Sequence, residues 1–274
     1  TRTDSSAASD VYKRQEEPGL KYISRILSEL RKYKNVTMRS RMMGAGVYDH
    51  GYLLGYERLN DHLSTNEGPR HRLWRIRAKQ IITATGAIER PLSFPGNDIP
   101  GIMLASAVRD YATNFGVAVG DKVAIFTNND DAYRTAITLH EIGVTVPVII
   151  DARSGGGGEL AHHAKELGIR VENGKAILKV FGQKRVKAVT ICDYEKSGAN
   201  KEKIECDSIA MSGGWSPVVH LFSHCGGKLK WDEDLALFRP DKAAKPTSYD
   251  GLPFVTAVGS CLLYTSPSPR DQVV

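Results

Sequence analysis

The residues best placed to do chemistry lie in the turn after an apolar run at Lys122–Phe126. A helical segment at Ala132–Gly143 and a second apolar run at Val144–Ile150 follow, and Asp151 comes directly after them. This order is typical of a nucleotide-binding strand–helix–strand unit. In such units, glycines in the turn let backbone N–H groups approach a pyrophosphate, and an acid binds a ribose hydroxyl. The segment therefore predicts a dinucleotide-binding scaffold.

The turn itself departs from that pattern. Its three glycine positions hold Thr127, Asn129 and Ala132, and Asp130 and Asp131 stand at the start of the helix. Carboxylates at this position suit the helix dipole but repel phosphate. We therefore expect a Rossmann-like unit whose phosphate cradle is impaired.

A second candidate site lies in Ile81–Pro91, where a buried strand ends in Thr85 and Gly86. A glycine at the end of a strand permits positive φ and lets the chain pass close to a bound cofactor. We expect Thr85 and Gly86 to line a nucleotide cleft without taking part in chemistry. The alternative is a strand-to-loop turn that needs glycine for its own geometry.

Two other glycine-containing segments have both a structural and a binding interpretation, and a third has only a structural one. Ser212–Pro217 is expected to be a domain hinge with Trp215 packed beneath it, the alternative being contact with a cofactor or a partner subunit. Met42–Asp49 is expected to run beside an adenine, the alternative being a bulge or bend in an edge strand. Gly155–Gly158 is expected to be a flexible connection.

The sequence gives little indication of a metal site or of a catalytic nucleophile. His220 and His224 would share a helix face next to Cys225, but no third ligand or general base accompanies them, so packing is favoured. No Ser-His-Asp set, Cys-His set or carboxylate pair can be assembled. We therefore assign no catalytic residue and no metal site.

Composition restricts the function further. The 274 residues are 41% apolar and 25% charged, with a net charge of +6, a balance typical of a globular enzyme. No Lys/Arg run and no basic stripe interleaved with aromatic residues is evident, which argues against nucleic acid. No apolar stretch is long enough for a membrane span, and no signal peptide is evident. The four cysteines are widely separated, which fits a reducing cytoplasm.

The order of the elements predicts one nucleotide-binding domain interrupted by a second. We expect the first domain to consist of residues 16–118 and 208–260, with a short strand at Val36–Arg39, and the inserted Rossmann-like domain to span 119–207. The expected fold class is therefore α/β, a truncated two-dinucleotide-domain, glutathione-reductase-like fold. Residues 1–15 and 261–274 resemble translated sequencing-adapter read-through and are expected to be foreign tails.

Several segments resemble the α subunit of heterotetrameric sarcosine oxidase. They are Thr-Ala-Thr-Gly-Ala-Ile-Glu-Arg-Pro in Ile82–Pro91, Ala105–Asp110, Phe-Thr-Asn-Asn-Asp-Asp-Ala-Tyr-Arg-Thr around Thr127–Thr135, Ser-Gly-Gly-Trp-Ser-Pro in Ser212–Pro217 and His-Leu-Phe-Ser-His-Cys-Gly-Gly-Lys-Leu in Val219–Trp231. The resemblance covers about 16–260 and corresponds to an internal slice of a longer subunit.

The resemblance implies a cytoplasmic complex that oxidises sarcosine with oxygen to glycine, hydrogen peroxide and formaldehyde, or methylene-tetrahydrofolate. It implies NAD in the α subunit, FAD in the β subunit and FMN between them, with γ and δ subunits completing the heterotetramer. The implied cofactor-binding residues are Gly44 beside the adenine, Thr85 and Gly86 in the cleft, and Gly259 and Ser260 in the closing glycine turn. The family's N-terminal glycine fingerprint and its folate domain are not in this sequence, so the fragment alone is expected to be inactive.

Two alternatives remain open. The chain could be the related subunit of a two-component oxidase acting on opines, hydroxyproline or other amines. It could instead be a scaffold whose nucleotide is purely structural. The altered turn at Thr127–Asp131 favours sarcosine oxidase, because the related oxidases typically have a more ordinary glycine fingerprint there.

Overall fold

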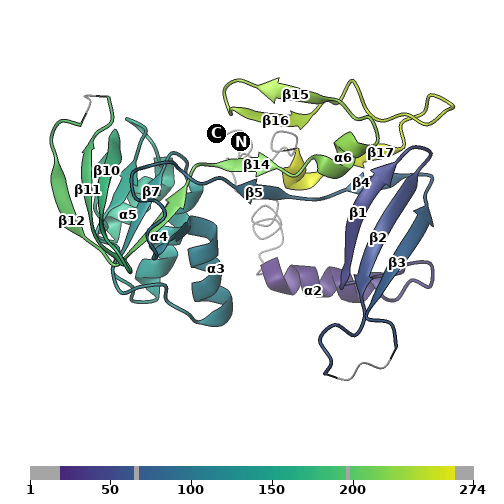
Figure 1. Cartoon of the computed structure of the whole chain (residues 1–274), viewed down its shortest axis with the longest axis horizontal. Helices are drawn as coiled ribbons and strands as arrows, with labels where there is room; N and C mark the ends of the chain where they lie inside the picture. Colours follow the sequence, from purple (N-terminus) through teal and green to yellow (C-terminus); the bar gives the residue numbers. More distant parts are fainter. Residues whose placement is uncertain (1–18, 65–67, 196–197, 263–274) are drawn as a thin grey trace. The chain divides into compact units, whose positions relative to one another are not determined.

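A parallel sheet of five strands, in the order β6-β13-β7-β8-β9, is the centre of one half of the chain in the computed structural model, which describes residues 19–64, 68–195 and 198–262 (Figure 1). Its middle strand, β7 (Val123–Thr127), is buried at every position. Side chains alternate across a strand, so Val123 and Ile125 enter one core while Ala124 and Phe126 enter another. A strand buried on both faces reads as a continuous apolar run, as this one does.

Helices cover one face of this sheet and a smaller antiparallel sheet, in the order β10-β11-β12, covers the other (Figure 1). The strands of this half are β6 (Ile102–Leu104), β7, β8 (Ile149–Asp151), β9 (Val171–Asn173), β10 (Lys175–Gly182), β11 (Val186–Asp193), β12 (Glu202–Glu205) and β13 (Ser208–Ser212). The helices are α3 (Ala105–Phe115), α4 (Asp131–Glu141) and α5 (Gly158–Glu166).

The start and the buried face of α4 follow from its sequence. Asp131 lies in the first turn, where a carboxylate stabilises the helix dipole. Ala132, Tyr133, Ala136 and Leu139 recur at helical spacing and are fully buried against the sheet. The expected strand, turn and helix at residues 122–143 are therefore present, and the following strand is β8, shorter than expected.

The other half of the chain contains three small sheets, which are the antiparallel β1-β2-β3, the parallel pair β17-β4 and the hairpin β15-β16. Its elements are α2 (Gly19–Leu30), β1 (Met42–Tyr48), β2 (Tyr52–Arg58), β3 (His71–Arg77), β4 (Ile81–Thr83), α6 (His220–His224), β15 (Leu229–Asp232), β16 (Leu237–Pro240), β17 (Val255–Ala257) and the short helix η1 (Gly259–Cys261). Val47, Phe222 and Val255 are central to its core.

The chain divides into two compact units, one of described residues up to Ile88 and from Ser216 onward, the other Glu89–Trp215. The strands β5 (Ala87–Glu89) and β14 (Trp215–Pro217), which pair with each other, contain these two boundaries. The second unit is wider than the expected inserted domain, 119–207. The reason is that β6 pairs with β13 and α3 packs on the same sheet, which brings residues before 119 into that unit.

One other expectation requires correction. The predicted strand at Val36–Arg39 is absent, and those residues form an irregular segment without a partner strand among the described residues. Cys261 and Leu262, where a foreign tail is expected to begin, pack in or against the core of the first unit, and the foreign origin of the tail remains a prediction. The other residues expected to be foreign, 1–15 and 263–274, lie outside the described part of the chain. No described helix is both long and apolar enough to cross a bilayer.

Candidate functional site

The carboxyl ends of β4 and β17 lie side by side, because these two strands pair in parallel. Beyond each strand the chain turns at a glycine with positive φ, +74° at Gly86 and +72° at Gly259. A Cβ placed on Gly86 would lie 4.0 Å from the Oγ of Ser260, so the two turns adjoin. The N–H of Val258 donates to the carbonyl of Thr83 at 2.9 Å and extends the pairing to the turns. Ligands of open α/β sheets bind at such an edge, outside the carboxyl ends of the strands.

Thr85 is held at this edge by backbone contacts. Its hydroxyl donates to the carbonyl of Val218, whose N–H donates in turn to the carbonyl of Gly86 at 2.9 Å. The structure therefore brings Thr85, Gly86, Gly259 and Ser260 together. Two glycines without a Cβ leave room for a ligand to approach the backbone at this edge.

Gly44 belongs to a different sheet from β4 and β17. It belongs to β1, whose pairing with β2 shifts register between Gly44 and Gly46, so the bulge considered as an alternative is present. A Cβ at Gly44 would meet the side chain of Leu221 at 3.2 Å. Packing against α6 therefore explains why residue 44 is a glycine. A contact between its backbone and an adenine remains a prediction.

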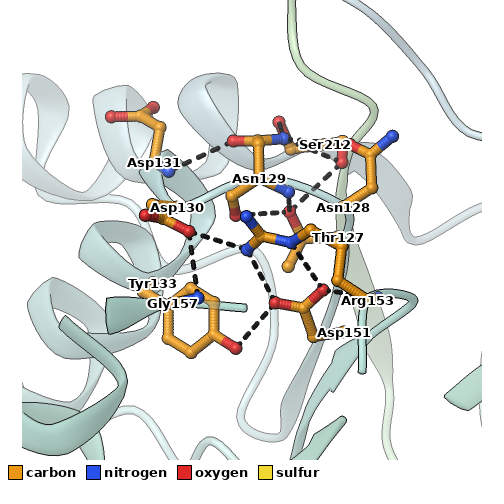
Figure 2. Close-up of polar contacts among 10 residues, drawn as sticks. All are labelled: Thr127, Asn128, Asn129, Asp130, Asp131, Tyr133, Asp151, Arg153, Gly157 and Ser212. Carbon is orange, nitrogen blue, oxygen red and sulfur yellow. Dashed lines mark hydrogen bonds and ion pairs between the residues drawn. The ribbon is translucent and has the colours of Figure 1, made fainter. Parts of the chain in front are cut away.

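The turn after β7 uses its polar groups internally (Figure 2). The Thr127 hydroxyl accepts from the Asn129 N–H at 3.0 Å and can donate to the Asn129 carbonyl at 2.9 Å. The Asn129 amide donates to the Ser212 carbonyl and hydroxyl at 3.1 and 2.9 Å, while its oxygen accepts from the Asp131 N–H at 3.1 Å. The backbone N–H groups of Asn129 and Asp131, which a phosphate would need, therefore already have acceptors.

Asp151, at the position of a ribose-binding acid, is completely buried. Its Oδ2 accepts from the Tyr133 hydroxyl and from the Arg153 guanidinium, both at 2.8 Å, and its Oδ1 accepts from the Arg153 backbone N–H at 2.9 Å and from Nε at 3.0 Å (Figure 2). Burial and then the negative charge of Asp151 raise the pKa of Tyr133, so its phenol remains a donor. The carboxylate is therefore fully occupied by protein groups.

Arg153 also binds the carboxylate at the helix start. Its Nη2 lies 2.7 Å from Oδ1 of Asp130, and the Gly157 N–H donates to the same oxygen at 3.0 Å (Figure 2). Burial alone would lower the pKa of Arg153, but hydrogen bonds to Asp151 and Asp130 outweigh burial and raise it. The guanidinium therefore stays charged between two carboxylates.

Two glycines of the run at 155–158, which was expected to be a flexible connection, pack closely against this cluster. A Cβ at Gly156 would lie 2.2 Å from Oδ2 of Asp151, and one at Gly157 would lie 2.6 Å from the Tyr133 ring. The loop approaches the buried groups closely because it has no side chains there. Sequence reasoning missed this role and the roles of Tyr133 and Arg153; an arginine two residues after the strand-end acid was the available signal.

The segment at Ser212–Pro217 is explained by packing. The Gly213 N–H donates to the Arg90 carbonyl at 2.7 Å, and the Arg90 N–H donates to the Gly214 carbonyl at 2.8 Å. A Cβ at Gly213 would lie 2.8 Å from the Pro91 carbonyl oxygen. Glycine is therefore needed for two backbones to approach, which favours the structural interpretation.

The residues considered for metal binding are in ordinary surroundings. Cys225 is buried, and its Sγ donates to the Phe222 carbonyl at 3.3 Å. Burial raises the pKa of the Cys225 thiol. His224 stacks with Tyr48 at 6.4 Å between ring centroids. In the part of the chain that the structure describes, no three His, Cys, Asp or Glu side chains form a metal-binding group.

Comparison with known sequences confirms the resemblance. The chain is 37% identical over 229 residues to the sarcosine oxidase alpha subunit of Corynebacterium sp. (strain U-96), covering 81% of this chain and 24% of that protein. The corresponding alpha subunit of Rhizobium meliloti (strain 1021) is 37% identical over 237 residues, 85% of this chain and 23% of its own length. The A subunit of opine oxidase from Agrobacterium tumefaciens (strain Ach5) is 24% identical over 192 residues, 64% of this chain and 37% of that protein. The chain thus spans about a quarter of the length of the sarcosine oxidase relatives it matches. No protein-family model matches it.

Comparison with solved structures confirms the fold class. Thioredoxin reductase of T. acidophilum matches with a TM-score of 0.64 at 17% identity, covering 93% of this chain and 77% of that chain. A FAD-dependent pyridine nucleotide-disulphide oxidoreductase from Desulfovibrio vulgaris matches with a TM-score of 0.54 at 14% identity, covering 85% of this chain and 58% of that chain. At such identities the likeness establishes the α/β fold that these reductases share and nothing finer.

Proposed function

We propose that this chain, a relative of sarcosine oxidase α subunits over most of its length, is an internal segment of the dinucleotide-binding subunit of a sarcosine-oxidising complex. The 37% identity to two such subunits supports sarcosine over opines, for which the identity falls to 24%. The complex would oxidise sarcosine with oxygen and water to glycine, hydrogen peroxide and formaldehyde. When folate is present, the one-carbon unit would leave as methylene-tetrahydrofolate instead of formaldehyde. Amine oxidation would take place in the β subunit, as the resemblance to sarcosine oxidase implies.

NAD is the proposed ligand of this segment, held in the first unit at the carboxyl ends of β4 and β17. The observation that carries this proposal is the pair of adjoining turns with positive φ at Gly86 and Gly259, next to Thr85 and Ser260. Gly44 would contact the adenine side through its backbone. FAD and FMN would be bound elsewhere in the complex, with β, γ and δ subunits as partners in the cytoplasm.

The inserted unit is proposed to be a structural part of the subunit rather than a second dinucleotide site. Asp151 and Asp130 already bind Arg153, and the glycine loop covers them. A nucleotide would have to displace these internal hydrogen bonds and would bring its phosphates near two carboxylates. This unit would therefore bind no dinucleotide while it remains folded.

The proposal is tested on the complete α subunit co-expressed with the subunits encoded beside it. The purified complex should produce peroxide with sarcosine and not with an opine, and should release NAD on denaturation. Gly86→Ala should lower bound NAD at least tenfold. Gly143→Ala is the matched control, because Gly143 also has positive φ, +87°, and nothing lies within 4 Å of its Cβ position. Equal NAD content in both variants, or peroxide production from opines alone, would contradict the proposal.

A further inference from the structure

Among the described residues, β3 is an edge strand without the bulge or proline that often protects such an edge. It is last in the order β1-β2-β3, and all seven of its residues pair with β2 in an uninterrupted register. The opposite edge, β1, carries a bulge between Gly44 and Gly46. Edge strands are usually protected by short length, bulges or proline. The only protection that β3 has is charge, and this charge has one sign.

The charge on β3 is positive and mostly uncompensated. Its sequence, His-Arg-Leu-Trp-Arg-Ile-Arg, contains three arginines and no acid. Arg75 has no hydrogen-bonding or ionic partner among the described residues. Arg77 donates to the His50 carbonyl at 3.1 Å and stacks on Tyr52 at 4.8 Å, so its charge is not neutralised. β3 therefore presents cations on both faces of the sheet edge, Arg72 on one face and Arg75 and Arg77 on the other.

A buried carboxylate holds the arginine on one of these faces. Glu57 is 6% exposed and accepts from the Trp74 indole N–H at 2.6 Å. It also forms ion pairs with Arg39 at 3.3 Å and Arg72 at 3.7 Å, whose guanidinium groups lie 4.9 and 5.5 Å from the Trp74 ring centroid. Since one carboxylate pairs with two arginines, this group of three side chains keeps a net positive charge. Side chains held in this way lose less conformational entropy when a partner binds.

We propose that β3 accepts an extended acidic segment of a partner subunit as a fourth strand. Main-chain hydrogen bonds to the open edge would provide affinity, and carboxylates opposite the arginines would provide specificity. A second copy of β3 is excluded as the occupant, because like charges directly opposite each other destabilise a strand pair. This inference rests on the proposed function, because a partner subunit exists only if the chain is part of a multi-subunit complex.

Charge reversal tests the inference in the assembled complex. With the tagged, complete α subunit as bait, Arg75→Glu/Arg77→Glu should lower the amount of co-purifying partner at least tenfold. Lys184→Glu/Lys187→Glu is the matched control, with the same charge change at exposed positions of the other unit. Thermal unfolding of both variants shows whether each is folded.

Hydrogen exchange on the unmodified protein gives an independent measure. The outward-facing amides of β3 should exchange at least tenfold more slowly in the complex than in the isolated α subunit. If the complex assembles and oxidises sarcosine while these amides exchange at equal rates, or if both charge variants co-purify equally, this inference is wrong and the proposed function stands. Loss of co-purifying nucleic acid instead of a protein partner would also overturn the inference. If no complex forms at all, both proposals fail.

Discussion

Replacing Arg153 by methionine tests whether the guanidinium stabilises the inserted unit by neutralising two carboxylates. The substitution removes three side-chain hydrogen bonds, at 2.7, 2.8 and 3.0 Å, and leaves Asp151 buried without a counter-charge. Removing one partner of a buried ion pair costs about 3–5 kcal/mol. Solvent reduces this cost because the Arg153 side chain is 36% exposed, and Asp151 keeps its bonds to the Tyr133 hydroxyl and the backbone N–H of residue 153. We therefore expect a loss of about 3 kcal/mol, the low end of that range.

Native-state hydrogen exchange is the appropriate assay, because it reports on this unit separately from the rest of the chain. A loss of about 3 kcal/mol corresponds to a roughly hundredfold faster exchange of the buried β7 amides. Arg153→Met/Asp151→Asn should recover part of the loss, because it also removes the unpaired buried charge. A change below about 0.5 kcal/mol for the single variant, or a double variant less stable than the single one, would show that the guanidinium does not act in this way.

Three further predictions concern the same unit. Gly156→Ala should destabilise it by about 2 kcal/mol, since the new Cβ would lie 2.2 Å from Asp151 Oδ2; Gly155→Ala, where nothing lies within 4 Å, should be near neutral in urea unfolding. Tyr133→Phe should cost about 1.5 kcal/mol in the same assay, because a buried carboxylate loses one donor, and an unchanged midpoint would contradict this. Burial raises the pKa of Cys206 to about 12, so iodoacetamide should not modify it in the folded protein at pH 8, and folding stability should fall as pH rises from about 9 toward 12 because only the unfolded thiol ionises. Rapid native alkylation, detected by mass spectrometry, would contradict the last prediction.

Local periodicity was enough to predict the central part of the fold. The buried run of β7, the helical spacing of α4 and the altered turn between them follow from residues close in sequence. Thr85 and Gly86 were recognised as possible cleft residues because a glycine ends their strand, whereas Gly259 was identified only through the family resemblance. Their adjacency required the parallel pairing of β4 with β17, which joins segments more than 170 residues apart.

Other features could not be predicted because they depend on long-range contacts. The hydrogen bonds that Asp130 accepts from Arg153 and Gly157 form only when the start of α4, the segment after β8 and the glycine loop come together. The basic stripe in His71–Arg77 was overlooked, although Trp74 stands among its arginines in the sequence. Its meaning depends on β3 being an edge strand, which is a property of sheet order and not of local pattern.

Photolabelling with an NAD analogue that carries an azido group on the adenine shows directly which unit holds the dinucleotide. The complete α subunit in its complex would be irradiated, digested and mapped by mass spectrometry. We expect label in peptides of the first unit, within 42–88 or 255–262. Label confined to residues 127–157 would contradict this expectation, because the dinucleotide would then occupy the site that Arg153 and the glycine loop are inferred to close.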